Sequence, residues 1–250
     1  MTEAPLDVSG LTAGYGKRDV IFDIGFSLEK GEVFGLIGLN GAGKTTLIKS
    51  ILGLGQCRGR IAIFGHPAGP PKSRSSLAYL PEKFQPSALL RGWEFLELTL
   101  AYFDLTLDRG AARALCAGLD LDAAVLDRNV RTYSKGMGQK LGLVGTLLTG
   151  LPLLILDEPM SGLDPKARIM LKDRLLEYGV NGRTIFFSSH ILADIEEICG
   201  RIGVIHAGDL IFLGTPAELI GHYQAPTLER AFLAAIDAYD RERGDRKRSN

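Results

Sequence analysis

The sequence is poor in cysteine, and the three cysteines that it contains lie far apart. Cys57, Cys116 and Cys199 form no CxxC pair and no cluster with histidine. Neither a disulfide framework nor a zinc site is therefore indicated. This sparse use of cysteine fits a reducing compartment.

Net charge and long apolar segments are also lacking. Lysine plus arginine and aspartate plus glutamate number 29 each, so overall charge gives no indication of a nucleic-acid partner. The longest uncharged run, residues 141–156, contains Gly150 and Pro152 and is shorter than the ~20 residues that span a bilayer. The first ten residues are acidic and have no apolar segment, unlike a signal peptide. We therefore expect a protein that does not itself cross a membrane.

The sequence does contain short apolar runs, each followed by polar residues and a helix-like segment. Residues 33–37 (VFGLI), 153–156 (LLIL) and 184–187 (TIFF) are apolar on both faces, which is typical of buried parallel strands. Their alternation with helical patterns predicts an α/β fold with a parallel sheet.

Other segments differ from this pattern. Residues 6–31 alternate in the manner of antiparallel strands, and residues 90–150 are mostly helical in pattern. Residues 202–214 predict a hairpin with its turn at Gly208 and Asp209. The basic residues 241–250 predict a disordered terminus, with contact to anionic lipid head groups as the alternative.

The most specific motif is GLNGAGKT, residues 38–45, which matches G-x-x-x-x-G-K-[ST]. It follows a predicted strand and begins a predicted helix. Its glycines let the backbone approach phosphate oxygens, and its N–H groups form an anion site at the helix N-terminus. Lys44 would reach the β- and γ-phosphates of a nucleotide, and Thr45 would bind Mg²⁺. The predicted nucleotide-binding residues of this loop are Gly38, Leu39, Asn40, Gly41, Ala42, Gly43, Lys44, Thr45 and Thr46.

Acidic residues follow the strand of residues 153–156, at the sheet edge where ligands gather. Asp157 is a predicted Mg²⁺ ligand, through water, and Glu158 would orient the attacking water or accept its proton. The alternative is a solvated loop start. His190 follows another strand, where it would contact the γ-phosphate. Glu158, His190 and Lys44 are therefore the predicted catalytic residues.

A second glycine-rich helix start is YSKGMGQKLG, residues 133–142. Ser134 is a plausible N-cap, whereas Gly136 and Gly138 each cost about 0.8–1.0 kcal/mol relative to alanine. Bare N–H groups at a helix start suit an anion. Since the chain has its own phosphate loop, the predicted target is the γ-phosphate held by another subunit.

Together, GLNGAGKTT, YSKGM, LLILDEP, SGLD and SSH occur in the order seen in ATP-binding-cassette (ABC) ATPases. The sequence resembles the nucleotide-binding subunits of bacterial ABC transporters whose permease is a separate chain, from about Tyr15 to about Phe232. This resemblance implies a P-loop NTPase (RecA-like) core with an antiparallel β subdomain and a helical insert. The implied single ABC ATPase domain, 1–240, comprises a core with the antiparallel part (1–83 and 151–215), a helical subdomain (84–150) and C-terminal helices (216–240), before the tail (241–250).

The resemblance further implies a head-to-tail dimer, either a homodimer or a heterodimer with another ABC ATPase subunit. Two ATP molecules with Mg²⁺ would lie at the seam, each between the phosphate loop of one protomer and the signature of the other. Tyr15 matches the aromatic residue that stacks on adenine, with a strand-edge tyrosine as the alternative, and His190 matches the switch histidine. The implied signature residues are Ser134, Lys135, Gly136 and Met137, and the implied coupling residues are Glu82, Ser161, Gly162, Leu163 and Asp164.

Two departures from the family pattern stand out. Tyr133, Lys135 and Met137 replace the first, third and fifth residues of the common signature Leu-Ser-Gly-Gly-Gln. Glu82 occupies the position of the Q-loop glutamine, with Gln85 as an alternative substitute. Glu82 joins Thr45 and Asp157 as a predicted metal ligand, and its negative charge is expected to change metal affinity.

The predicted function is ATP hydrolysis that powers transport through a separate membrane permease, on the cytoplasmic face of the cell membrane. The permease would dock at Glu82 and residues 83–95, although Phe84, Trp93 and Phe95 are core residues in the alternative interpretation. No nucleic-acid partner is predicted. The alternatives are a soluble ABC ATPase acting on nucleic acid or ribosomes, a module that binds ATP without turnover, and an unrelated P-loop kinase.

Overall fold

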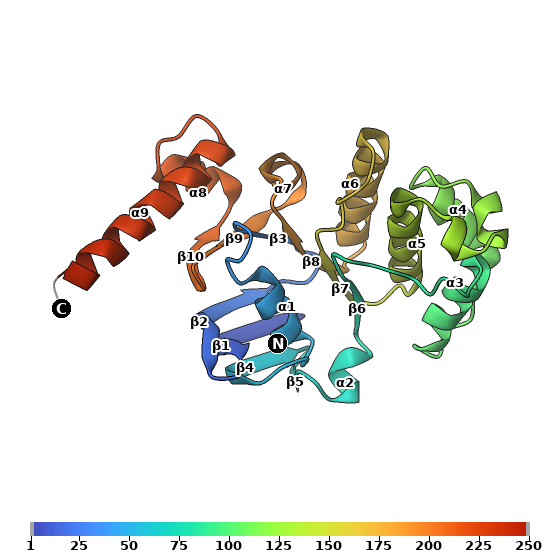
Figure 1. Cartoon of the computed structure of the whole chain (residues 1–250), viewed down its shortest axis with the longest axis horizontal. Helices are drawn as coiled ribbons and strands as arrows, with labels where there is room; N and C mark the ends of the chain where they lie inside the picture. Colours follow the sequence, from blue (N-terminus) through green and yellow to red (C-terminus); the bar gives the residue numbers. More distant parts are fainter. Residues whose placement is uncertain (1–2, 249–250) are drawn as a thin grey trace.

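The computed structural model describes residues 3–248, with side chains described up to residue 245. A six-stranded sheet forms its centre (Figure 1). The strands are β3 (Val33–Ile37), β6 (Leu77–Leu80), β7 (Leu153–Asp157), β8 (Thr184–Ser189), β9 (Arg201–His206) and β10 (Asp209–Gly214). Their order is β10-β9-β3-β8-β7-β6, and every neighbouring pair is parallel except β9 with β10. The predicted parallel sheet is confirmed.

A second sheet has four strands in the order β2-β1-β4-β5. Its strands are β1 (Leu6–Tyr15), β2 (Arg18–Leu28), β4 (Cys57–Ile63) and β5 (His66–Pro67). Every pairing in this sheet is antiparallel, as the alternating sequence pattern predicted. Helix α1 (Lys44–Ile51) contacts strands of both sheets, so the segment that follows β3 is held between the two layers.

The central strands are apolar on both faces because their side chains alternate between two hydrophobic clusters. In β8, Ile185 and Phe187 belong to the cluster that the helices share, whereas Phe186 belongs to the cluster that the antiparallel sheet shares. Phe186 stacks on Phe34 of β3 and on Phe26 of β2, with ring centroids 5.6 and 6.0 Å apart. Burial on both faces explains why these strands are continuous apolar runs in the sequence.

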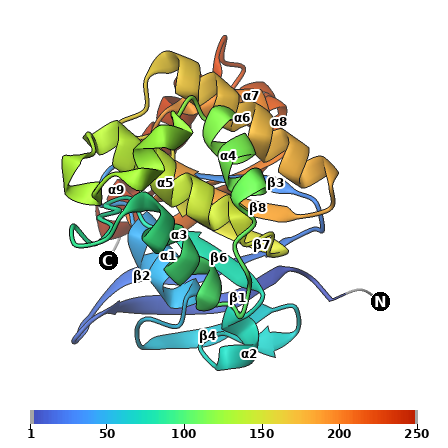
Figure 2. The ribbon, with the colours of Figure 1, turned by 90° about the vertical axis from the view of Figure 1, so that its right-hand side faces the viewer.

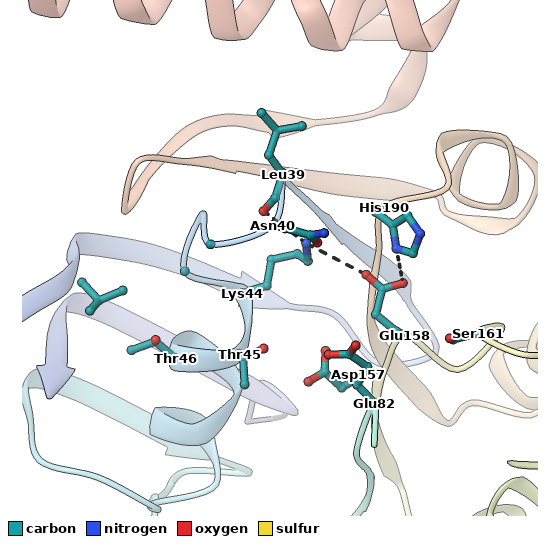
Figure 3. A pocket seen from close by; sticks show the side chains of 13 residues that line it. Leu39, Asn40, Lys44, Thr45, Thr46, Glu82, Asp157, Glu158, Ser161 and His190 are labelled. Atoms are coloured by element: carbon teal, nitrogen blue, oxygen red, sulfur yellow. Dashed lines mark hydrogen bonds and ion pairs between the residues drawn. The ribbon is translucent and has the colours of Figure 1, made fainter. Parts of the chain in front are cut away.

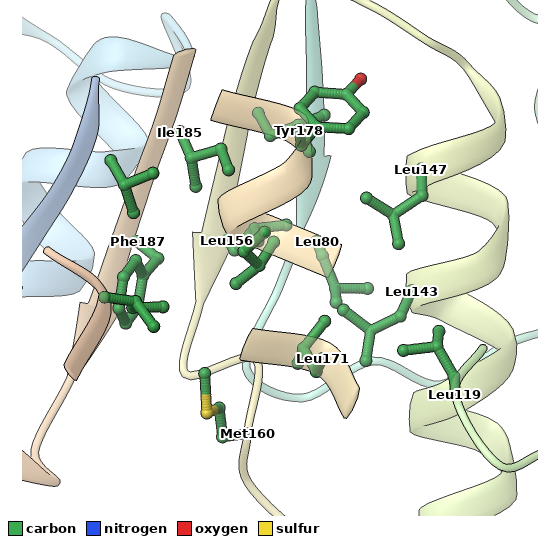
Figure 4. Packing of buried hydrophobic residues seen from close by; sticks show 14 of the residues in the cluster. Leu80, Leu119, Leu143, Leu147, Leu156, Met160, Leu171, Tyr178, Ile185 and Phe187 are labelled. Atoms are coloured by element: carbon green, nitrogen blue, oxygen red, sulfur yellow. The ribbon is translucent and has the colours of Figure 1, made fainter. Parts of the chain in front are cut away.

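The segment between β6 and β7 is helical and lies at one end of the molecule (Figures 1 and 2). It comprises α3 (Gly92–Ala101), α4 (Arg109–Ala117), two 3₁₀ helices (Ala123–Asp127 and Val130–Thr132) and α5 (Lys135–Leu148). Leu143 and Leu147 of α5 point toward Leu80 of the sheet and toward α6 (Pro165–Val180) (Figure 4). The helical segment and the central sheet therefore share one hydrophobic cluster.

The three aromatic residues of the segment after Glu82 pack in or against this core. Trp93 is 6% exposed, and the guanidinium carbon of Arg109 lies 4.8 Å from the centre of its ring. Phe84 and Phe95 meet edge to face at 5.5 Å and pack against the same cluster. The core interpretation is confirmed for Trp93, whereas Phe84 and Phe95 are half-buried at the margin of the cluster.

Two expectations for the C-terminal part need correction. The turn of the hairpin lies at Ala207 and Gly208, both with positive φ (48° and 91°), and not at Gly208 and Asp209. The tail predicted as disordered continues α9 (Leu228–Arg248) for residues 241–248, whereas residues 249–250 lie outside the described part. Arg243 connects this continuation to the hairpin turn, because its guanidinium donates to the Ala207 carbonyl and to the Tyr239 hydroxyl.

Four further helices lie outside the segments described above, and two of them are near the C-terminus. The four are α2 (Pro71–Arg74), α7 (Leu192–Ile198), α8 (Pro216–His222) and α9. Helix α9 extends to one side of the central sheet (Figure 1). Across the residues that the structure describes, no helix combines the length and the apolar character that a membrane crossing requires.

Candidate functional site

The phosphate loop, residues 38–46, leads from β3 into α1. Gly41 and Gly43 have φ of 81° and 119°, in the region that glycine adopts without steric cost. A Cβ atom at Gly38 would lie 2.5 Å from the Ile205 carbonyl oxygen, so the loop packs directly on β9. Gly43 is the N-cap of α1, and no described side chain caps this helix. Its first N–H groups are therefore available to an anion.

Lys44 folds back over this loop. Its ammonium donates to the Gly38 carbonyl at 2.6 Å and to the Leu39 carbonyl at 3.4 Å. The same Nζ lies 4.0 Å from Glu158 Oε1. Lys44 is only 8% exposed, so a positive charge stands where the phosphate groups of a bound nucleotide would enter.

The acidic pair lies opposite the loop, at the carboxyl end of β7. Asp157 is the last residue of the strand, and Glu158 follows it with φ of 51°. Glu158 Oε2 lies 2.8 Å from His190 Nδ1 (Figure 3). The structure thus brings together the three predicted catalytic residues, Lys44, Glu158 and His190, in one continuous row.

The charge around Asp157 is arranged for a cation. Burial raises the pKa of Asp157, and the carboxylates of Glu82 and Glu158 raise it further, against the hydrogen bond from Ser188 and the charge of Lys44. Within the described residues, no group of three or more His, Cys, Asp or Glu side chains is arranged to hold a metal ion alone. This donor set fits Mg²⁺, which takes one or two carboxylates and completes its shell with phosphate oxygens and water.

These groups line one cavity of about 410 Å³ beside the carboxyl ends of the parallel strands. A concave site of this kind at the sheet edge is where ligands of open parallel sheets bind. The predicted metal ligands Thr45, Asp157 and Glu82 all reach it, together with the coupling residue Ser161. The lining residues are Val20, Leu39, Asn40, Gly41, Gly43, Lys44, Thr45, Thr46, Glu82, Asp157, Glu158, Ser161 and His190.

Tyr15 is not among the residues that line this cavity. Its side chain lies beside α1, where its hydroxyl accepts from Lys49 Nζ at 3.5 Å and the ammonium lies 5.6 Å from the ring centre. A hydrogen bond with Thr46 lowers the pKa of Tyr15. With 57% of the residue exposed, the ring remains accessible at the edge of the phosphate loop.

The signature residues also lie away from the cavity of their own chain. Ser134 caps α5 by accepting from the Met137 N–H at 3.2 Å, as the sequence predicted. Ser134 and Lys135 line a second cavity of about 500 Å³, which they share with Glu82 and Ser161. The start of α5 is therefore a separate candidate anion site, adjacent to the first but not part of it.

The signature helix is nevertheless connected to the acidic segment of the same chain. Gln139 donates from its amide to the Pro159 carbonyl at 3.2 Å. Lys140 donates to Asp164 Oδ2 at 3.2 Å, and Asp164 in turn caps α6. A Cβ atom at Gly136 would lie 3.1 Å from the Gly162 carbonyl oxygen, so the two segments pack closely. Leu163 packs against the hydrophobic cluster that the helices share.

Sequence reasoning missed Gln139, Lys140 and Ser188 as members of this arrangement. Gln139 and Lys140 are buried polar residues on a helix that is otherwise apolar in its middle. Ser188 is a polar residue in a strand that is buried at every position. A polar side chain that directly adjoins an apolar run is the signal that would have identified them, because buried polar groups require partners.

Comparison with known proteins identifies the family of this chain. The profile of the family described as "ABC transporter" matches residues 21–161. The linearmycin resistance ATP-binding protein LnrL of Bacillus subtilis is 31% identical over 244 residues, which cover 92% of this chain and 78% of that protein. The chain belongs to the ABC transporter family.

Two further comparisons agree with membership of the ABC transporter family. An uncharacterized ABC transporter ATP-binding protein of Synechocystis is 39% identical over 210 residues, or 82% of this chain, and the match spans 59% of that longer protein. A solved structure of an ATP binding subunit of an ABC transporter superposes with a TM-score of 0.85 at 34% identity, over 92% of this chain and 98% of that one. The predicted P-loop NTPase fold is confirmed.

Proposed function

We propose that this ABC transporter protein binds ATP with Mg²⁺ and hydrolyses it to drive transport through a separate membrane permease. The observation that carries the proposal is the row Lys44, Glu158 and His190 across one cavity, with distances of 4.0 and 2.8 Å. Phosphoryl transfer depends chiefly on positioning and on charge stabilisation. This row supplies a cation, a base and a hydrogen-bonding partner for the base at one site.

Each residue of the row has a distinct role in the proposal. Lys44 and the N–H groups of the phosphate loop bind the phosphates and stabilise their charge. Glu158 accepts the proton of the attacking water, and His190 holds the Glu158 carboxylate in orientation. Thr45, Asp157 and Glu82 would hold Mg²⁺, which neutralises phosphate charge when it is bound.

The proposal includes a head-to-tail dimer. The start of α5 has a serine cap and no acidic residue in its first turn, and it faces a cavity other than the one that contains Lys44. A helix N-terminus of this kind binds anions, and a second protomer, identical or from another ABC ATPase chain, would bring its nucleotide there. Closing the two protomers would exclude water and complete both sites.

The permease is expected to dock on the surface beside the second cavity. With Trp93 in the core and Phe95 half-buried against it, the surface available to a partner is narrower than the predicted segment, residues 83–95, although Phe84 still lines the second cavity. This surface contains Leu89, which is 88% exposed, and Lys83 and Arg131 at the cavity. Docking here would hold the protein on the cytoplasmic face of the membrane. The docked permease would lie near Glu82, which lines both cavities, so that movement of the helical segment would be transmitted to the nucleotide site.

The proposed domain organisation is a single ABC ATPase domain over residues 1–240, with α9 continuing beyond it. The chain spans about three fifths of the length of the Synechocystis relative, so activity and partners are assigned here to the ABC domain. The similarity to ATP-binding proteins of transporters supports a transport role over a role on nucleic acid or ribosomes.

The permease hypothesis is tested by purifying the full chain from membranes of cells that contain it. We expect an integral membrane permease to co-purify, and a Leu89→Asp variant to lose it while retaining ATP binding. Recovery with ribosomes or DNA alone, and not with a permease, would contradict the proposal.

A further inference from the structure

Ser188 places a hydroxyl group inside an apolar strand. All positions of β8 are buried, and Ser188 is 0% exposed. Burying a hydroxyl group costs free energy unless it is hydrogen-bonded. The partners of Ser188 therefore explain why a polar residue occupies this position.

The hydroxyl of Ser188 contacts both acidic residues at the end of β7. Its O–H donates to Asp157 Oδ1 at 2.5 Å, and its oxygen accepts from the Glu158 N–H at 3.1 Å. The Ser188 carbonyl also accepts from the same N–H, at 3.2 Å. A serine hydroxyl has a single donor, and here that donor is committed to Asp157.

The hydrogen bond to Asp157 fixes the orientation of a carboxylate that lines the cavity. A carboxylate with one oxygen engaged no longer rotates freely, so its second oxygen keeps one direction. Charge-assisted hydrogen bonds to carboxylates are short and strong. Ser188 thus determines how Asp157 is presented to a metal ion bound with the nucleotide.

The hydrogen bond to Glu158 acts on the backbone. Glu158 has φ of 51°, a left-handed conformation that is strained for a non-glycine residue and persists where its surroundings enforce it. The hydroxyl and carbonyl of Ser188 both hold the Glu158 N–H in this turn. The turn is what directs the Glu158 carboxylate toward Lys44 and His190 (Figure 3).

We propose that Ser188 is a positioning residue for ATP hydrolysis, whose single hydroxyl orients Asp157 for the metal ion and Glu158 for the attacking water. This inference rests on the proposed hydrolytic function. The neighbouring Ser189 provides a matched comparison, because it is also buried, at 2% exposed. Its hydroxyl accepts from the Ile191 N–H at 3.0 Å, across the turn that carries His190, and not from the Glu158 N–H as the Ser188 hydroxyl does.

The test compares Ser188→Ala, Ser188→Thr and Ser189→Ala in the full chain. Steady-state kinetics give kcat and the KM for ATP, and electron paramagnetic resonance of Mn²⁺ gives metal affinity in the presence of a non-hydrolysable ATP analogue. Thermal unfolding, followed by circular dichroism, shows that each variant is folded at the assay temperature.

We expect Ser188→Ala to lower kcat about tenfold or more, the effect of one lost hydrogen bond to a charged group. Its KM for ATP should change less than about threefold, because Lys44 and the phosphate loop remain intact. Mn²⁺ should bind more weakly, because Asp157 loses the hydrogen bond that orients its carboxylate. Ser188→Thr retains the hydroxyl and should recover most of the loss. Ser189→Ala should retain Mn²⁺ affinity, which is the property that separates the two serines, because its hydroxyl holds the turn of His190 and not Asp157.

Three results would overturn the inference: wild-type kcat and Mn²⁺ affinity in folded Ser188→Ala, equal losses of Mn²⁺ affinity in both alanine variants, or a rise in KM alone. A wild-type protein without ATPase activity would instead contradict the proposed function. In that case the Mn²⁺ titration still decides whether Ser188 orients Asp157, because it does not depend on turnover.

Discussion

His190 Nδ1 lies 2.8 Å from Glu158 Oε2, although 32 positions separate the two residues in the chain. The pair exists because β7 and β8 are parallel neighbours in register, with Asp157 opposite Ser188. The carboxyl ends of both strands therefore deliver side chains to the same edge of the sheet. Glu158 Oε1 also lies 4.0 Å from Lys44 Nζ, and the pairing with His190 gives its carboxylate a fixed direction.

Replacing His190 with alanine is expected to reduce ATP hydrolysis by about 10²-fold, within the range that positioned acid–base groups contribute. Binding of ATP, measured with a fluorescent analogue, should change little because the phosphate loop is untouched. His66→Ala, on the exposed strand β5, is the control and should behave as wild type. Normal turnover in His190→Ala would remove the histidine from its assigned role.

Ser134→Arg is expected to retain ATP binding and to lose turnover, because it blocks the start of α5 and leaves the phosphate loop of its own chain intact. Lys44→Ala has the opposite defect. A mixture of the two inactive proteins should regain hydrolysis, since each mixed dimer contains one site with an intact loop and an intact signature. Mixtures as inactive as the separate variants would contradict a site shared between protomers.

Phe186→Ala is expected to lower the free energy of unfolding by about 3–5 kcal/mol, as large-to-small substitutions in cores do. The ring is 0% exposed between the two sheets and stacks on Phe34 and Phe26. Urea unfolding measures the loss, with Phe22→Ala, 37% exposed, as the milder comparison. A change below about 1 kcal/mol at Phe186 would show that the two sheets do not depend on this stack.

Asp157→Asn is expected to stabilise the nucleotide-free protein at pH 7. Burial and the neighbouring carboxylates raise the pKa of Asp157 in the folded state. The contribution of Asp157 to the free energy of unfolding is therefore fully present below its unfolded pKa and is lost as the pH rises through its folded pKa. The melting temperature of wild type should therefore fall relative to that of Asp157→Asn as the pH rises above about 4, the ordinary pKa of an aspartate. Parallel pH profiles of melting temperature for the two proteins would show that Asp157 does not cause the pH dependence of stability.

Much of this arrangement could be predicted from the sequence, because the signals are local. Residues 33–37 and 184–187 are apolar on both faces, which is the pattern of a buried strand. Gly41 and Gly43 indicate the loop, because its backbone conformation favours glycine. The Ser134 cap was predictable for the same reason, as it is formed within one helical turn.

What could not be predicted depends on contacts between distant segments. Arg243 in the tail donates to the Ala207 carbonyl, 36 positions away, a contact that the charged local sequence does not reveal. Gln139 and Ser188 acquire their meaning from Pro159, Asp157 and Glu158, which lie on other elements. Sequence spacing does not reveal such partners until the strand order is known.

The central claim, that Glu158 acts in ATP hydrolysis within a closed dimer, is tested most directly by the Glu158→Gln variant. The molar mass of this variant should be measured by gel filtration with light scattering, with and without ATP and Mg²⁺, beside its rate of phosphate release. The account predicts loss of hydrolysis by about 10²-fold or more, together with a stable dimer that forms only when ATP is present. Phosphate release at the wild-type rate, or a monomer at saturating ATP, would contradict it.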